Sequence, residues 1–377
     1  MVTRLENGGA QRQTLQIVRE LPRDRFDVAL AYGPGGFLDA QAESIDDLLM
    51  LPVQALQRDL GVGSDLRALF ELRSILGPDA KARPVILHTH SSKAGVVGRT
   101  AGLGLGLNAV VHTVHGFGFH AGGSARSRRV LMGVERTMRR ASDWILTVSE
   151  ADRNFGIERG LIDREKSSVI RSGIDVAAFE RQPEAGAAFR AELGIPEGAP
   201  VIGTVACFKP QKAPEDHIAA FAAFLEGQPE AHFIWVGDGE GRPPIEAQLA
   251  AQPDLAARVH LIGWSDRIVD LLSALDIFLL ISRWEGLPRS LLEARAAGVP
   301  CVVSDICGNP EAIGYGRHGV VVPVDRPDLA AQALAELWID PARRSRIRGE
   351  SHDNLDAFDA RHVTPMHVEL YEQLLAR

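Results

Sequence analysis

Residues 276–305 read DIFLLISRWEGLPRSLLEARAAGVPCVVSD, and this stretch decides the fold class. Its apolar runs and its segment with apolar residues at helical spacing predict a strand (277–281), a loop, a helix and a second strand (301–304). Pro288 suits the first turn of that helix, and Gly298 suits the position just past its end. Consecutive strands joined by a helix predict a parallel sheet with a right-handed crossover.

The same alternation of strand and helix runs along almost the whole chain. Val- and Ile-rich runs bounded by Gly, Pro, Asp or Ser predict strands at 27–32, 85–88, 109–114, 144–148, 168–171, 201–206, 232–236, 259–262 and 319–323. The rhythm breaks at residues 175–200, a polar stretch rich in Ala, Gly and Pro that predicts an interdomain linker and hinge. We therefore expect an α/β protein with two Rossmann-like parallel-sheet domains, 1–180 and 181–359, and a C-terminal helix at about 360–377 that packs on the first.

The start of the chain is short of a complete strand. Residues 2–5 resemble only the end of a strand, and a Gly8-Gly9 turn follows at once. Because an open α/β domain usually begins with a complete strand, we expect that the start of this chain clips or shortens strand one.

Composition excludes several classes of protein. Of 377 residues, 45% are hydrophobic and 24% are charged, which excludes wholesale disorder. The net charge of −8 argues against a nucleic-acid partner, because binding phosphates needs a basic surface. Three cysteines (Cys207, Cys301 and Cys307) are too few for a disulfide framework, and no apolar run reaches about 18 residues. We therefore expect a cytoplasmic protein.

The loop at 282–288, SRWEGLP, carries the residues that suggest a ligand. It lies at the carboxyl end of a predicted parallel strand, where open α/β sheets bind ligands. The N-terminus of the next helix offers free N–H groups to a phosphate, and Glu285 and Glu293 can each accept two hydrogen bonds from neighbouring sugar hydroxyls. The spacing alone is a weak signal, but in this context it favours a nucleotide-sugar site.

Seven residues separate Glu285 from Glu293, and the sequence ARAAGVPCVVSD follows. This pattern resembles the retaining glycosyltransferases of family GT4, which have the GT-B fold. Further stretches agree in order: GGAQRQTL (8–15), THSSKAGVVGRTAG (89–102), HTVHGFGFH (112–120), SDWILTVSEADR (142–153), VIRSGIDVAAF (169–179), VGDGEGR (236–242), HLIGW (260–264) and GNPEAI (308–313). The resemblance covers nearly the whole chain. It implies a first domain that binds the acceptor and a second that binds a nucleotide-sugar donor, the two facing across a cleft.

The resemblance assigns roles in the second domain. Lys212 matches the family lysine that contacts the diphosphate, where negative charge builds as the donor breaks. Glu285 would hold hydroxyls of the donor sugar, and Glu293 those of the ribose. Gly286 and Leu287 would offer amides to the phosphate.

Other candidate residues lie in glycine loops and at strand ends. Gly8 and Gly9 resemble the loop that lets the backbone approach the donor phosphates. His115 follows a strand and resembles the family histidine near the transferred sugar, where a neutral imidazole could bond a hydroxyl or the departing group. Gly237 bends a donor loop, and Arg242 is either a phosphate contact or an ordinary surface arginine. The remaining nearby histidines are assigned to structure: His88, His90, His112 and His120.

The chain departs from the family pattern at one phosphate contact. The family usually has an arginine a few residues before the lysine, and Cys207 stands in that place. Lys209, two residues on, either takes over that contact or is a solvated turn lysine. No pair of carboxylates suggests a metal site, so we expect no metal and no cofactor beyond the nucleoside-diphosphate sugar as co-substrate. Retention is implied by the family, and since no carboxylate nucleophile can be named, we favour front-side attack.

Residues 124–142 read SARSRRVLMGVERTMRRAS and carry a net charge of about +5 in an acidic protein. A basic amphipathic helix with Leu131, Val134 and Met138 on one face can rest on anionic lipid. That would place the protein peripherally on the inner face of the membrane and would suit a lipid-linked or growing polysaccharide acceptor. The alternative is a core-facing helix with solvated arginines. The six arginines are Arg126, Arg128, Arg129, Arg136, Arg139 and Arg140.

The leading interpretation is therefore a retaining glycosyltransferase that uses a nucleoside-diphosphate sugar. Two alternatives stay open: a GT-B-fold sugar-nucleotide epimerase, and a non-catalytic nucleotide-binding module. The module would predict G-x-G-x-x-G after a first strand, and the nearest glycine run, at 102–106, lacks that context.

Overall fold

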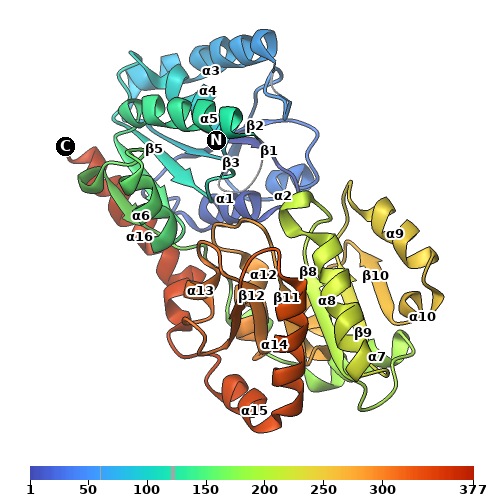
Figure 1. Cartoon of the computed structure of the whole chain (residues 1–377). Coiled ribbons are helices and arrows are strands. Elements are labelled where there is room, and N and C mark those ends of the chain that lie inside the picture. The colour runs from blue at the N-terminus through green and yellow to red at the C-terminus, as the bar shows by residue number, and fades with distance from the viewer. Residues whose placement is uncertain (60, 120–123) are drawn as a thin grey trace. The chain divides into compact units, whose positions relative to one another are not determined.

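The computed structural model describes residues 1–59, 61–119 and 124–377, which form two compact units (Figure 1). Unit 1 comprises Met1–Gly173 and Ala360–Arg377, and unit 2 comprises Ile174–Asp359. His120, assigned to structure from the sequence, lies outside the described residues.

The division after Gly173 falls earlier in the chain than the boundary expected at 180/181. Residues 175–200, expected to form a linker, lie within unit 2 and contain helix α7 (Pro183–Glu192). This helix packs on α11 (Ile268–Ala274) and buries Phe189, so its apolar face holds the segment against unit 2.

The strands of unit 1 are all parallel and run in two hydrogen-bonded groups, β1-β2-β3 and β4-β5-β6-β7. The Met1 ammonium donates to the His88 carbonyl (2.7 Å), and the His90 amide donates to the Met1 carbonyl (2.9 Å). These bonds place β1 beside β4. The strands are β1 (Val2–Arg4), β2 (Val28–Gly33), β3 (Leu48–Pro52), β4 (Ile86–His90), β5 (Ala109–Val114), β6 (Trp144–Thr147) and β7 (Ser167–Val169).

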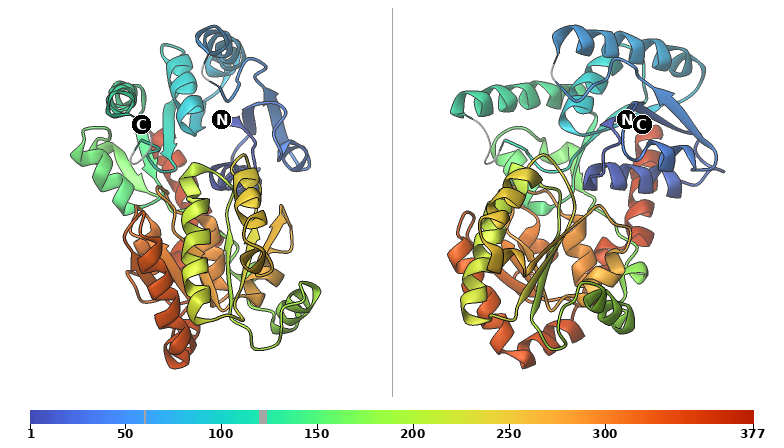
Figure 2. Two further views of the ribbon diagram at one scale, coloured as in Figure 1. Left: turned by 45° about the vertical axis from the view of Figure 1, so that its right-hand side comes forward. Right: turned by 90° about the vertical axis from the view of Figure 1, so that its right-hand side faces the viewer.

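Helices cover both faces of the strands of unit 1. The helices α3, α4 and α5 lie side by side on one face, and α16 packs against α1 on the other (Figures 1 and 2). Buried Val363, Leu370 and Leu374 anchor α16 in the core beneath β5 and β6. The helical segments are α1 (Gly9–Glu20), α2 (Asp39–Glu43), α3 (Val62–Ala82), α4 (Ser92–Gly102), α5 (Ala125–Met138), α6 (Glu150–Glu158) and α16 (Ala360–Leu375), with short turns η1 (Arg139–Ala141) and η2 (Arg164–Lys166).

Unit 2 is built on one parallel sheet with the strand order β10-β9-β8-β11-β12-β13. Every residue of β9 and of β11 is buried, which is typical of a parallel sheet covered on both faces. The strands are β8 (Val201–Val205), β9 (His232–Val236), β10 (Val259–Gly263), β11 (Ile277–Leu280), β12 (Cys301–Ser304) and β13 (Gly319–Val322).

The helices of unit 2 connect these strands, with α8 and α14 packed together (Figure 1). Gly298 takes φ +68° directly after Ala297, the C-cap of α12, as its predicted position requires. The helical segments that follow α7 are α8 (Pro214–Gly227), α9 (Arg242–Ala250), α10 (Pro253–Ala256), α11, α12 (Arg289–Ala296), α13 (Asn309–Ala312), α14 (Pro327–Ile339) and α15 (Pro341–Gly349), with turns η3 (Ala177–Phe179), η4 (Pro210–Lys212) and η5 (Leu355–Phe358).

The predicted strands are confirmed to within about two residues, but β3 was missed. Its sequence, LLMLP, ends in Pro52, and a proline demotes a run that otherwise looks like a strand. In the structure β3 pairs only with β2 and lies at the edge of its sheet, where the missing proline N–H is tolerated.

Strand order fixes where a ligand can bind in unit 2. The chain moves outward from β8 to β10, then returns to place β11 on the other side of β8. In open α/β sheets ligands bind at such a reversal, beyond the carboxyl ends of the two central strands, because the connections on either side lead away from it. The loops that follow β8 and β11 therefore surround the expected binding position.

Gly237 follows β9 and packs tightly against the loop after β8. It has φ +142°, and a Cβ here would overlap the carbonyl oxygen of Ala206. We predict that Gly237→Ala lowers the free energy of unfolding by about 3 kcal/mol, from overlap and backbone strain together. Gly227→Ala, in the same unit but with open space around the added methyl group, should be neutral or stabilise by up to about 1 kcal/mol. Urea denaturation measures both, and equal effects would contradict this explanation.

Candidate functional site

Lys212 and Glu285 form the centre of the candidate site in unit 2. Lys212 ends η4 after β8, and Glu285 lies in the loop after β11, so they follow the two strands at the reversal point. The Lys212 ammonium and the Glu285 carboxylate form an ion pair, with 12% and 6% of their side chains exposed. The loss of either partner would leave a buried charge uncompensated. The sequence thus predicted two residues that the structure brings into direct contact.

Gln211 ties the loops after β8 and β11 together. Its side-chain amide donates to the Trp284 carbonyl (2.9 Å) and, more weakly, to Glu285 Oε2 (3.4 Å). Its own carbonyl accepts from the Arg283 amide (2.8 Å). Because these bonds flank the ion pair on both loops, they fix the distance between Lys212 and Glu285.

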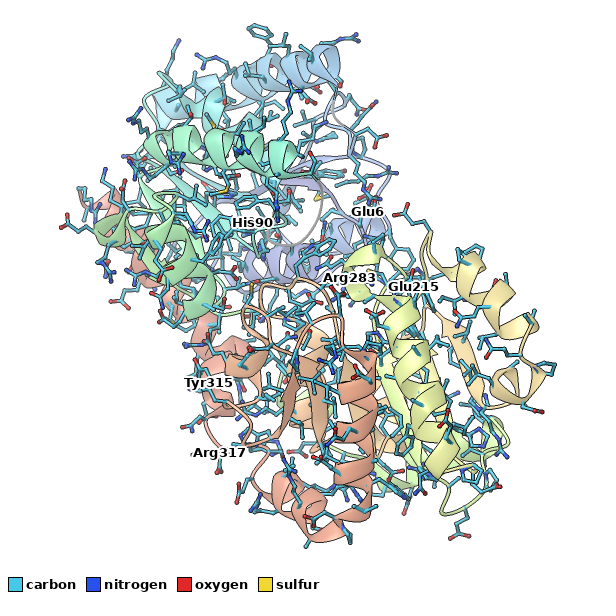
Figure 3. All side chains as sticks on the ribbon, viewed as in Figure 1. Glu6, His90, Glu215, Arg283, Tyr315 and Arg317 are labelled. Atoms are coloured by element: carbon cyan, nitrogen blue, oxygen red, sulfur yellow. The ribbon has the colours of Figure 1, made fainter. Side chains whose placement is uncertain are left out.

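Arg283 braces the same two loops from the outside. Its guanidinium donates to Asp325 (2.8 Å), Asp216 (3.2 Å) and the Pro210 carbonyl (3.1 Å). Glu215 lies 3.9 Å away, and Figure 3 shows Arg283 and Glu215 near one another. Sequence reasoning missed this residue, although it stands only two positions before Glu285.

His217 supports the backbone next to Lys212. Ala213 adopts the left-handed conformation (φ +46°, ψ +58°), which is unfavourable for a residue with a Cβ. His217 Nδ1 lies 3.0 Å from the Ala213 carbonyl, and the Ile281 amide donates to Nε2 (3.3 Å). A neutral imidazole with its proton on Nδ1 satisfies both contacts, so His217 joins the start of α8 to the end of β11. A histidine four residues after the turn was the only sequence signal for this role.

Glu293 lies on the second turn of α12 and is half-buried, whereas Gly286 and Leu287 are buried in the loop before the helix. The Gly286 carbonyl accepts from the Gly308 amide (2.9 Å), which attaches this loop to the start of α13. Within the described residues, no side chain caps the N-terminus of α12, and its first turn carries no acidic residue. That end of the helix is therefore compatible with an anion.

Gly237 and Arg242 have structural explanations of their own. The loop at Gly237 packs against the backbone of Ala206, whose carbonyl also accepts from the Trp235 indole (2.7 Å). The Arg242 guanidinium bonds Glu246 (2.7 Å) and the Leu261 carbonyl (3.3 Å). These contacts hold Arg242 to its own helix and to β10.

Lys209 and Cys207 lie on the loop that leads into η4. Both are half-buried, and Lys209 precedes the turn that ends in Lys212, whose amide donates to the Lys209 carbonyl (2.8 Å). Lys209 thus stays a candidate for the contact that Cys207 does not supply.

In unit 1, Gly8 and Gly9 form the N-terminus of α1. Gly8 is extended (φ −137°), and an added Cβ would meet only the flexible end of Gln11. Gly9 is exposed as the first residue of the helix. The backbone at Gly8 therefore does not require glycine, which leaves close approach of a ligand as a reason for it.

His115 follows β5 and is half-buried, with Gly116 after it in a positive-φ conformation (+107°) that turns the chain. His115 Nε2 lies 3.0 Å from Nδ1 of His90, a residue the sequence assigned to structure alone. Burial lowers the pKa of His115 to about 4, so the ring is neutral at physiological pH.

The chain matches two descriptions of glycosyltransferase families. The family description "Glycosyltransferase Family 4" matches residues 7–178, and "Glycosyl transferases group 1" matches residues 187–352. The Escherichia coli enzyme UDP-Gal:alpha-D-GlcNAc-diphosphoundecaprenol alpha-1,3-galactosyltransferase is 31% identical over 334 residues, which cover 88% of this chain and 85% of that enzyme. The chain belongs to glycosyltransferase family 4. Alpha-maltose-1-phosphate synthase of Mycolicibacterium smegmatis is 26% identical, over 77% of this chain and 79% of the relative.

Solved structures show the fold of this family 4 glycosyltransferase. HepE of Anabaena, in complex with UDP and glucose, matches with a TM-score of 0.82 at 20% identity, over 97% of this chain and 96% of HepE. Sucrose-phosphate synthase of Thermosynechococcus elongatus matches with a TM-score of 0.83 at 20% identity, over 98% and 94%. The GT-B fold and the glycosyltransferase class are thereby confirmed, and the relatives give no support to the epimerase.

Buried neutral histidines make this glycosyltransferase sensitive to acid. Burial lowers the pKa of His217, His115 and His367 to about 4, below the ordinary value of 6.5. Between these values the unfolded chain binds protons that the folded chain does not, so the contribution of these histidines to stability is complete above pH 6.5 and falls as the pH drops toward 4. Each such histidine contributes a slope of up to about 1.4 kcal/mol per pH unit.

Urea denaturation at pH 7, 6 and 5 measures this slope. We predict a smaller slope for His217→Gln, because this variant lacks one of the buried neutral histidines. Stability that is constant from pH 7 to 5 would contradict the prediction.

Proposed function

We propose that this glycosyltransferase moves a hexose, with retention of configuration, from a UDP-sugar to an acceptor carried on a polyprenyl diphosphate. The observation that carries the proposal is the buried Lys212–Glu285 pair at the carboxyl ends of β8 and β11. A cation beside a carboxylate matches a donor whose diphosphate and sugar hydroxyls are adjacent.

The leaving diphosphate explains why Lys212 is needed. As the bond between sugar C1 and the phosphate oxygen breaks, negative charge grows on the phosphate, and a nearby ammonium stabilises it. Lys212 must then exchange Glu285 for the diphosphate, which frees the Glu285 carboxylate to accept hydrogen bonds from the sugar. Glu293, on the second turn of α12, would accept from the ribose hydroxyls, and the amides at Gly286 and Leu287 would meet the phosphate.

Front-side attack accounts for retention. The acceptor oxygen bonds C1 on the face that the phosphate leaves, and the acceptor proton passes to the departing phosphate oxygen. His115 is a neutral hydrogen-bonding group for the sugar in this scheme, and Gly8 and Gly9 permit close approach of the backbone. Lys212 and the N-terminus of α12 supply the positive potential, and the reaction is proposed to proceed without a metal or other cofactor.

The relatives support the choice of substrates. The name of the E. coli relative gives UDP-galactose as donor and GlcNAc-diphosphoundecaprenol as acceptor. HepE, at lower identity, holds UDP and glucose. Because the E. coli relative and this chain match over most of both, we propose a uridine donor and a diphosphate-linked lipid acceptor for this chain as well.

A ligand series tests the donor. We predict that UDP and one UDP-hexose raise the melting temperature, whereas GDP, ADP and NAD leave it unchanged, because only a ligand that binds the folded chain stabilises it. Glu293→Gln should reduce the UDP shift by weakening the ribose contact, and Glu336→Gln, on an exposed face of α14, serves as the control. A shift with NAD alone, or with every nucleotide equally, would contradict the proposal.

The basic helix α5 supports the proposal that the enzyme meets its lipid acceptor at a membrane surface. It lies along an outer edge of unit 1 (Figure 2) and buries none of its described side chains. Val130, Leu131 and Val134 are 60%, 43% and 36% exposed, whereas Met132 packs on the core and Met138 accepts a hydrogen bond from Thr100, so α5 presents a partly apolar outer face. No helix in the described part of the chain has the length and apolar character to span a bilayer.

The arginines of this segment divide into two groups. Arg136 donates to the Arg159 carbonyl, and Arg139 pairs with Asp163, both at 2.9 Å. These two arginines therefore make contacts within unit 1. Arg136 is itself exposed, and so are the remaining four: Arg126, Arg128, Arg129 and Arg140.

Liposome binding tests the membrane surface. Exchanging Arg126, Arg128 and Arg129 for glutamine should weaken binding to vesicles with anionic lipid by about 3 kcal/mol, at about 1 kcal/mol for each arginine. Changing Arg19, Arg164 and Arg346, three exposed arginines outside α5, alters the net charge equally and should have little effect. Equal effects of the two triple variants in vesicle co-sedimentation would reject α5 as the contact.

A further inference from the structure

We propose that His90 is a positioning residue that donates a hydrogen bond from Nδ1–H to Nε2 of His115 and so leaves Nδ1–H of His115 as the group that meets the substrate. This inference rests on the proposed role of His115. It extends that role by naming the nitrogen that works and the residue that selects it.

The rings of His90 and His115 lie next to each other at the ends of neighbouring strands. His90 Nδ1 and His115 Nε2 are 3.0 Å apart, a hydrogen-bond distance. His90 is the last residue of β4 and His115 follows the end of β5, its parallel neighbour. Figure 3 labels His90 among the strands of unit 1. Since His90 is 3% exposed and His115 is half-buried, His90 is the inner member of the pair.

The positions of the ring protons decide which nitrogen of His115 can meet a ligand. A neutral imidazole has one N–H and one bare nitrogen, and the pair requires one hydrogen between its two facing nitrogens. In either orientation, Nε2 of His115 is occupied, and only its Nδ1 is left for a ligand. A sugar hydroxyl can pair with either form of Nδ1, whereas a departing phosphate oxygen needs a donor, because negative charge grows there. That need selects the orientation in which His90 donates.

A second layer of side chains holds His90 in place. His88, two residues earlier on the same face of β4, has its ring centre 4.2 Å from that of His90. His88 Nδ1 contacts the Tyr371 hydroxyl of α16 (2.6 Å), and His88 Nε2 contacts the Thr113 hydroxyl (2.7 Å). Both ring nitrogens of His88 are thus hydrogen-bonded. These bonds hold the His88 ring in place, and the His90 ring lies against it.

Burial keeps the side chains of His88, His90 and Tyr371 uncharged. It lowers the pKa of His88 and of His90 well below 6.5, since desolvation and the neighbouring rings both disfavour the imidazolium. Burial also raises the pKa of Tyr371, so its hydroxyl stays protonated. A neutral His90 is the state that can donate from Nδ1 while its other nitrogen is bare.

Nitrogen-15 NMR of the histidine rings in the full chain tests the proposal without any substrate. In the wild-type protein the ring shifts of His115 should report a proton on Nδ1, the less common tautomer of a free imidazole. In His90→Leu the shifts should change to those of the Nε2–H tautomer. An Nε2–H tautomer of His115 in the wild-type protein would overturn the proposal.

Kinetics separates positioning from packing. His90→Leu should lower kcat about ten- to a hundredfold with little change in the donor KM, the range seen when the hydrogen-bond partner of a metal-ligating histidine is removed. His90→Asn, whose amide nitrogen can take the place of Nδ1, should recover most of that loss. His112→Leu is the matched control, because His112 is equally buried but bonds Thr89, the residue of β4 that faces α4. Equal losses of kcat and of melting temperature in both leucine variants would indicate packing alone and reject the proposal.

Failure of the proposed function gives a different result. If His115→Ala keeps full transfer activity, His115 has no role in the reaction, whatever its tautomer. If His115→Ala is inactive but His90→Leu keeps both full kcat and the Nδ1–H tautomer, the transfer role stands and His90 does not position His115.

Discussion

The ion pair between Lys212 and Glu285 is the interaction on which the candidate donor site depends. Two charges with so little exposure are stable only together, since a buried charge without a partner is strongly disfavoured. The surrounding contacts serve this pair: Gln211 links the two loops, Arg283 braces them, and His217 supports the backbone beside Lys212. A donor with a diphosphate next to a sugar offers each charge a replacement partner. The pair is therefore both a stabilising contact in the free protein and the contact that the substrate is proposed to exchange.

The topology explains why these residues meet although they are far apart in the sequence. In unit 2 the strand order reverses between β8 and β11, and the loops after these strands carry Lys212 and Glu285. Unit 1 shows the same principle, because β1 lies beside β4, and the loop after β1 carries Gly8 and Gly9. His90 and His115 end neighbouring strands, β4 and β5. In each unit, all of these candidate residues follow the carboxyl ends of parallel strands, where backbone groups and side chains can converge on a ligand.

Most of the fold could be predicted from the sequence, because buried parallel strands leave continuous apolar runs and helices leave a regular spacing. Lys212 and Glu285 were predicted because they lie in stretches with family resemblance. His90 and His217 were not, because one sequence carries no record of which side chains meet across strands or between a helix and a strand end. The α5 segment is amphipathic in either of two settings, and only the structure shows that Val130, Leu131 and Val134 are exposed, whereas Met132 packs on the core. Gly237 looked like part of a ligand loop, whereas its contact with Ala206 gives it a reason within the fold.

The most direct test is a calorimetric titration of UDP into the wild-type protein, Lys212→Met and Glu285→Gln. If UDP replaces Glu285 as the partner of Lys212, Lys212→Met should weaken UDP binding about tenfold or more, equivalent to about 1.4 kcal/mol. Glu285→Gln should bind UDP at least as tightly as the wild type, because the lysine no longer has to leave a carboxylate, and should lose affinity only for the complete UDP-sugar. Equal weakening of UDP by both variants, or no change in either, would contradict the account.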